Sequence, residues 1–204
     1  MAGPHITISS KRTLTAFSPL LKGVMLQGGF SANPSCAKKV QDFLKLKADD
    51  LAEPVESEEG FGAWYVNHFQ VDRRKCLIFM NEKSLLSFIL FGVKKSNTKK
   101  ETFHELCLNG VFQLFEIEGF PIDYINVILD NSKQSRYMKT TDRKTLGNLN
   151  DLIFLYEHRI LSDGGLEYCD LTEIIMKINR TPQRNIGWGY SVDKAKEILS
   201  EIAT

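Results

Sequence analysis

The chain has 204 residues, of which 43% are hydrophobic and 25% are charged, and its formal net charge is +1 at pH 7. This length and composition are typical of a globular protein with a core of its own, and they exclude a disordered chain. Because the net charge is close to zero, attraction to nucleic acid would have to come from local basic patches. The longest apolar run, residues 84–93, is shorter than the ~18 residues that span a bilayer, so we expect a soluble, cytoplasmic protein with no membrane partner.

The four cysteines and four histidines are scattered along the chain. Cys36, Cys76, Cys107 and Cys169 include no C-x-x-C pair, and no H-x-x-x-H pattern occurs. Such spacings are those of neither a zinc site nor a secreted disulfide framework. We therefore expect reduced thiols in a cytosolic protein, with no metal or other cofactor.

Residues 1–30 contain no acidic residue and several serines and threonines, a composition that transit peptides share. A mis-assigned start, with Met25 as an alternative beginning, explains this composition equally well. We treat residues 1–30 as an N-terminal extension or leader, residues 31–162 as the core domain, and residues 163–204 as a helical extension packed on the core.

The first elements after this extension are a weak strand candidate around residues 24–32 and an amphipathic helix over residues 35–46. Residues 47–60 carry acidic side chains and a proline, which predict a solvated loop.

The hydrophobic pattern changes from residue 61 onward. Residues 61–72, 75–81 and 84–93 are rich in aromatic and aliphatic side chains and are separated by short polar links. These segments predict a three-stranded antiparallel meander.

Helical signals dominate from there on. Thr98 and Glu101 have the spacing of a capping box, so a helix should begin there and end at Gly119, before a second helix that starts near Pro121. A short extended piece near residues 135–140 precedes the next helix.

That helix opens at Thr141 or Asp142 and runs to about Ile160. Residues 171–180 look helical, and Ser191 can cap a last helix. We therefore predict an α+β protein whose antiparallel meander sheet of about four or five strands packs against helices on one side.

The helix that opens at Thr141 or Asp142 has a polar stripe beside its apolar face. The stripe contains Arg143, Gly147, Asn150 and Phe154, with Asp151 and His158 slightly further round. A glycine inside a helix costs about 1 kcal/mol relative to alanine, so Gly147 suggests that another group approaches this surface.

Two interpretations of the polar stripe stay open. In the functional interpretation, Arg143 presents its guanidinium to an anionic group, which Asn150 and Asp151 orient by hydrogen bonding. In the structural interpretation, Thr141 or Asp142 caps the helix, Asn150 ties down a neighbouring loop, and Arg143 pairs with an acidic residue such as Asp151.

Basic side chains cluster at three places, and two converging clusters would form a basic face. Tyr137 and Trp188 could then stack on unpaired bases. The acidic loop over residues 49–59 would suit a protein partner just as well. The clusters are Lys133, Arg136, Lys139, Arg143 and Lys144; Arg73, Arg74 and Lys75; and Lys94, Lys95, Lys99 and Lys100.

The stretches WYVNHFQVDRRKCLIFMNEKSLLSFIL and KTTDRKTLGNLNDL resemble a family of prokaryotic domains of unknown function whose members often occur near mobile-element genes. The resemblance covers roughly residues 31–161. Thr141 stands where the family often has asparagine. The family's motif positions are occupied here by Trp64, Asn67, Arg74, Lys75, Asn81, Asp142, Arg143, Gly147, Asn150 and Asp151.

No Walker loop, G-x-G-x-x-G or G-x-S-x-G element occurs, although His158 with Asp151 or Glu157 could do acid–base work in an enzyme of unrecognised type. We expect a non-catalytic binding module of a mobile-element or defence system that binds nucleic acid or another phosphate-bearing ligand. The alternative is a protein-interaction subunit, such as an inhibitor, an antitoxin-like protein or an accessory protein. The expected ligand-binding residues are Arg143, Asn150, Asp151, Arg73, Arg74, Lys75, Asn81 and His158.

Overall fold

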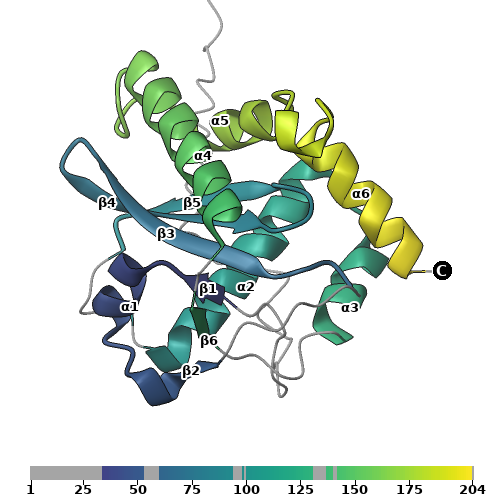
Figure 1. The fold of residues 1–204 in the computed structure, drawn as a ribbon. Coiled ribbons are helices and arrows are strands. Elements are labelled where there is room, and N and C mark those ends of the chain that lie inside the picture. Colours follow the sequence, from purple (N-terminus) through teal and green to yellow (C-terminus); the bar gives the residue numbers. More distant parts are fainter. Residues whose placement is uncertain are drawn as a thin grey trace, which may run out of the picture.

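The computed structural model describes residues 34–52, 60–93, 98, 100–130, 137–139 and 142–203. These residues form one six-stranded sheet in the order β2-β6-β1-β3-β4-β5, covered by helices (Figure 1). Within this described part, every helix is too short or too polar to cross a membrane. Residues 1–30 and the strand candidate at 24–32 lie outside the described residues.

The antiparallel half of the sheet consists of β3 (Trp64–Val71), β4 (Arg74–Asn81) and β5 (Ser87–Phe91). Trp64 pairs with Asn81 across β3 and β4, and Met80 pairs with Ser87 across β4 and β5. The predicted three-stranded meander is therefore confirmed.

The other half of the sheet is parallel. It consists of β1 (Pro34–Cys36), β6 (Tyr137–Lys139) and β2 (Leu51–Ala52). An antiparallel meander of four or five strands is thus not confirmed, and the segment predicted as a solvated loop contains both β2 and a 3-10 turn, η2 (Ala48–Asp50). Strands of two or three residues are too short to show the alternation by which a strand is recognised in sequence.

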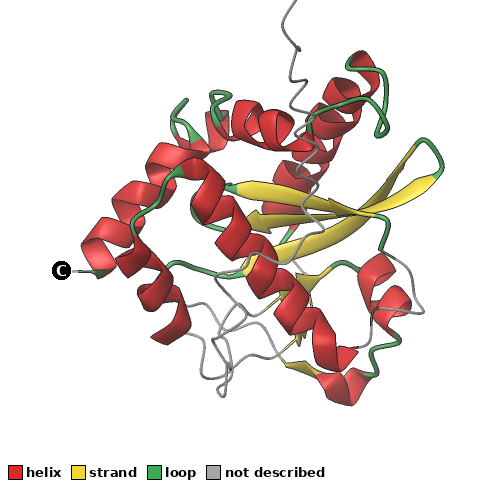
Figure 2. Cartoon of the chain, turned by 180° about the vertical axis from the view of Figure 1, so that it is seen from behind, coloured by secondary structure: helices red, strands yellow, loops and turns green. Residues whose placement is uncertain are grey.

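Helices cover both faces of the sheet, and the expectation of helices on one side was wrong. Helix α4 (Arg143–Ser162) crosses one face, and α2 (Lys100–Glu118) crosses the other, as the two opposite views show (Figures 1 and 2). The physical reason lies in β4, where every residue from Cys76 to Asn81 is buried. A strand buried at successive positions needs cover on both sides.

The core between α2 and the sheet is aromatic. The Phe79 and Phe88 rings are stacked with centroids 4.7 Å apart, and Trp64 meets Phe88 edge-on. Gly110 of α2 faces Phe88, and a Cβ at this position would lie 2.1 Å from that ring. The glycine therefore lets α2 approach the sheet closely.

The remaining helices are α1 (Lys38–Leu44), α3 (Ile122–Asp130), α5 (Leu171–Asn179) and α6 (Ser191–Ile202), with the 3-10 turn η3 (Arg184–Ile186) before α6. Helices α1, α3, α5 and α6 each match a predicted helix. The cap of the last helix was predicted one residue late, because Tyr190 is its N-cap and Ser191 is its first helical residue.

Candidate functional site

Asp142 fixes the start of α4. Its carboxylate accepts hydrogen bonds from the backbone N–H groups of Lys144 at 3.0 Å and Thr145 at 2.9 Å. The Thr145 hydroxyl donates to the same carboxylate, and these bonds from Thr145 are the main cause of the lowered pKa of Asp142. The capping part of the structural interpretation is therefore confirmed.

The polar stripe beyond this cap faces solvent. Arg143, Asn150, Asp151 and His158 are all exposed. Among the described residues, none of these four side chains has a hydrogen-bond or ion-pair partner. The pairing of Arg143 with Asp151, which the structural interpretation offered, does not form, and no described residue covers these four groups.

Gly147 lies in the same exposed surface with ordinary helical geometry. A Cβ at Gly147 would meet no atom within 4 Å. No described part of the chain approaches it, so packing among the described residues does not account for a glycine here.

Two large apolar side chains share this surface with the stripe. Phe154 is 66% exposed and Leu161 is 58% exposed. At ~100° per residue, Arg143, Gly147, Asn150, Phe154, His158 and Leu161 fall within about 40° of one line along the helix. We call these six residues the outward face of α4. The buried side of α4 carries Leu149, Leu152, Tyr156 and Ile160.

The basic hairpin turn lies near the opposite end of α4 from Arg143. Arg74 forms an ion pair with Glu167, and the Asp72 carboxylate accepts a bond of 2.9 Å from the Leu166 N–H. Both partners follow the C-terminal end of α4, whose 20 residues span about 30 Å. Arg143 and Arg74 are therefore not brought together.

The neighbours of Arg74 in this turn differ in their surroundings. Arg73 is exposed and has a φ of +61°, in the left-handed region. The Lys75 ammonium lies 5.9 Å from the centre of the Phe43 ring. Lys133, Arg136, Lys94, Lys95 and Lys99 lie outside the described residues.

Asn81 is fully buried, and its side chain is used within the chain. Its amide donates to the Phe61 carbonyl at 2.9 Å, and its Oδ1 accepts from the Ser84 N–H at 3.0 Å and the Ser84 hydroxyl at 2.8 Å. The Asn81 side chain therefore stabilises the turn between β4 and β5.

A loop before α6 carries Trp188, which the sequence suggested as a stacking surface, and Arg184, which was not among the expected ligand-binding residues. Trp188 is 68% exposed and has a φ of +64°. The backbone N–H of Trp188 donates to the Gln183 carbonyl at 2.9 Å, and the Asn185 side-chain amide donates to the Asn148 side-chain oxygen on α4. The exposed side chains of Arg184 and Trp188 are thus carried by a loop that is tied to the N-terminal half of α4. Prolines and glycines marked this loop in the sequence, but its contact with α4 is long-range.

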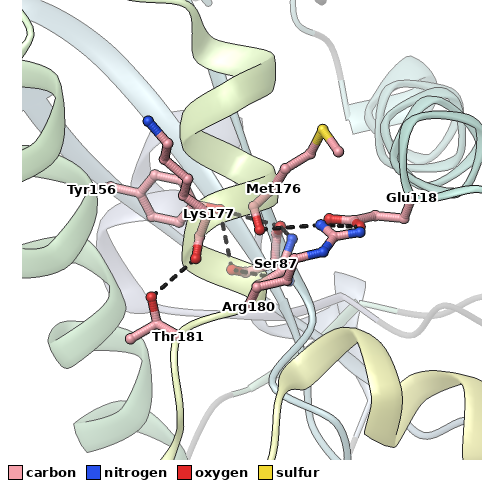
Figure 3. A network of polar contacts seen from close by, with 8 residues as sticks. Ser87, Glu118, Tyr156, Met176, Lys177, Arg180 and Thr181 are labelled. Atoms are coloured by element: carbon pink, nitrogen blue, oxygen red, sulfur yellow. Dashed lines mark hydrogen bonds and ion pairs between the residues drawn. The ribbon is translucent and has the colours of Figure 1, made fainter.

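A buried polar network joins the packed side of α4 to strand β5 and helix α5 (Figure 3). The Asn179 side chain accepts from the Ser87 N–H and donates to the Ser87 carbonyl, both at 2.9 Å. The Tyr156 hydroxyl donates to the same carbonyl at 3.2 Å. Because β5 is an edge strand, Asn179 takes the place of a neighbouring strand and anchors α5 to the sheet, while Tyr156 anchors α4.

Glu118 lies at one end of this network and is buried at the end of α2. Its Oε2 lies 2.5 Å from Arg180 Nη1 in an ion pair, without the alignment of a hydrogen bond. Burial raises the pKa of the Glu118 carboxyl, and the charge of Arg180 opposes this effect. Within the described ranges, no three His, Cys, Asp or Glu side chains are grouped as metal ligands would be.

Comparison with known proteins identifies the family and nothing closer. Neither the curated proteins nor the solved structures include a match to the chain. A family described as "Domain of unknown function (DUF6933)" matches residues 35–194, which include all of the sheet except Pro34, the outward face of α4 and the Trp188 loop. Because this match covers most of the chain, the protein belongs to the DUF6933 family.

Proposed function

We propose that the protein is a non-catalytic binding module and that the outward face of α4 docks a protein. The observation that carries this proposal is the exposure of Phe154 and Leu161 on a helix whose opposite side is fully packed. Soluble proteins expose single apolar residues routinely, but aligned apolar residues with polar groups around them are typical of interaction surfaces.

The charge distribution supports a protein partner over a phosphate backbone at this face. Arg143 lies at one end, Asp151 lies beside the middle, and Glu157 is half-buried at the flank. The basic hairpin turn lies near the far end of α4, and Arg74 is already paired there. A face of mixed charge around aromatic and aliphatic side chains fits another protein surface.

Photo-crosslinking in the native host tests this proposal. A photoreactive amino acid at position 154 should give one discrete crosslinked product. The same group at Asn126, which is exposed on α3, should give none. If position 154 gives no product, the outward face of α4 is not a docking surface.

A specific observation favours a second candidate, which is a site for a phosphate-bearing ligand such as single-stranded nucleic acid. Trp188 and Arg184 are exposed in one loop, whose Asn185 bonds to Asn148 of α4, one helical turn after Lys144. Aromatic stacking beside cationic side chains binds unpaired bases. We also propose, as expected from the sequence, that the protein is cytoplasmic and works in a mobile-element or defence system.

Fluorescence measures this second candidate directly. The chain has two tryptophans, and Trp64 is only 1% exposed, so quenching by a single-stranded oligonucleotide would report on Trp188. We expect quenching at low salt, with a log–log salt dependence of about −0.7 per phosphate contact. An unchanged spectrum at low salt would exclude this site.

A further inference from the structure

The outward face of α4 is complementary to itself when the helix is reversed about Phe154. Gly147 lies seven residues before Phe154, and Leu161 lies seven residues after it. Reversal therefore exchanges these two positions. The exposed Leu161 side chain of one copy would meet the open space above Gly147 of another, where no described atom of its own chain lies within 4 Å of a Cβ position.

The polar groups that flank this line are complementary in the same arrangement. Asp151 and His158 lie on one side of the line, and Asn150 and Glu157 lie on the other. In a two-fold antiparallel pair, each side faces the same side of the other copy with its order reversed. Asp151 would thus face His158 of the second copy, and Asn150 would face Glu157, so a carboxylate meets an imidazole or an amide in both cases.

Both basic and acidic groups lie near the ends of the reversed helices. Arg143 and Lys144 at the start of α4 would approach the turn that follows α4 in the second copy. Asp163, the C-cap residue of α4, is exposed in that turn. The basic hairpin turn lies near the same end of α4, where Arg74 is paired with Glu167, so the charge complementarity of the reversed pair rests on the contacts beside its middle.

We propose that two copies of this chain associate through α4, antiparallel, with the Phe154 rings packed on each other at the two-fold axis. This inference rests on the proposed function, and it identifies the docked protein as a second copy of this chain. It also gives Gly147 a physical role, since a missing side chain lets two helices approach closely and leaves room for Leu161. A single helix pair buries a small interface, so we expect a weak, concentration-dependent dimer.

A charge exchange between two variants tests the predicted pairing. Asp151→His places two imidazoles opposite each other, and His158→Asp places two carboxylates opposite each other. Each variant alone should dimerise at least tenfold more weakly than the wild-type protein in sedimentation velocity. An equimolar mixture should recover association as a heterodimer, because both contacts then join an aspartate and a histidine. Exposed positions make both variants compatible with folding, which circular dichroism verifies.

A covalent test uses the two-fold axis. In Phe154→Cys, the two new thiols face each other, and mild oxidation should give a disulfide-linked dimer. The control Asn126→Cys, on α3, should stay monomeric under the same oxidation.

The outcomes separate this inference from the proposed function. If wild-type protein is monomeric at the highest attainable concentration, or if both charge variants dimerise like the wild type, the self-association is wrong. If position 154 then crosslinks to a different protein in the host, the docking face stands with another occupant. A crosslink to residues 1–33 of the same chain, or no crosslink at all, overturns both proposals.

Discussion

Gly147 is the residue at which stability and binding are expected to oppose each other. It lies inside a 20-residue helix, and a Cβ there would have no neighbour within 4 Å. The backbone is helical, so alanine can adopt it without strain. A glycine therefore destabilises the helix for no reason that lies within the described chain.

Replacing Gly147 by alanine should raise the free energy of unfolding by about 0.5–1 kcal/mol, because alanine has the higher helix propensity. The same methyl group should weaken association, because it occupies the space that receives Leu161 of the second copy. Urea unfolding and sedimentation velocity measure the two effects, and Asn126→Ala on α3 is the control that should leave association unchanged. A variant that is less stable than the wild type would show that Gly147 serves the fold.

Single residues also show how far sequence reasoning reached at the site. The i, i+4, i+7 spacing placed Arg143, Gly147 and Asn150 on one surface, because a helix fixes angular positions locally. The link between Arg74 and Glu167, and that between Asn148 and Asn185, depend on segments far apart in the chain. Periodicity within one segment carries no information about such contacts.

At the level of elements, the edge strand β5 is closed by a side chain in place of a strand. Asn179 makes a reciprocal pair of bonds of 2.9 Å with the Ser87 backbone, and both residues are fully buried. An exposed strand edge is a site for unwanted pairing, and a helix laid along it prevents this. The helix over residues 171–180 was predicted from its period, but its contact with the sheet edge was not.

The change Asn179→Ala should lower the free energy of unfolding by roughly 2–4 kcal/mol, because it leaves the Ser87 N–H and carbonyl buried without partners. Asn179→Asp keeps the acceptor but places a carboxylate oxygen against the Ser87 carbonyl, so it should also destabilise. Urea unfolding measures both, and hydrogen exchange should show faster exchange of the Ser87 amide. If Asn179→Ala and Asn126→Ala have equal effects, water replaces the lost bonds and β5 does not need this helix.

The elements themselves were predictable to different degrees for physical reasons. Long segments, such as β3, β4 and α4, show many residues of a repeating pattern. The strands β1 and β2 have three and two residues, and their pairing with β6 depends on the tertiary fold. The apolar run from Cys76 to Met80 is typical of a strand buried on both faces, and the prediction of helices on one side did not use this signal.

At the level of the whole molecule, the C-terminal ends of α2 and α5 are joined by the buried carboxylate of Glu118 and the guanidinium of Arg180. The Glu118 side chain is 0% exposed, whereas its partner Arg180 is 42% exposed. Removing the negative charge therefore leaves a cation that water can reach, and the variant keeps no unpaired charge in the core. Glu116 lies on the same helix and is exposed, so it provides a matched control.

Glu118→Gln should change the way stability depends on pH. Burial raises the pKa of Glu118 above its ordinary value of 4.5, so the native state binds this proton more tightly than the unfolded state does. The wild-type protein therefore loses stability as the pH rises from about 4.5 through the raised native pKa. Glutamine does not titrate, so the free energy of unfolding of the variant minus that of the wild type should increase over this range.

Burial lowers the pKa values of His68 and His104, and their effects cancel because both proteins contain them. Urea unfolding at a series of pH values from 4 to 8 measures the difference, with Glu116→Gln as the control for removing a carboxylate from the exposed side of the same helix. A difference that falls as the pH rises would mean that the attraction of Arg180 outweighs the burial of the carboxylate.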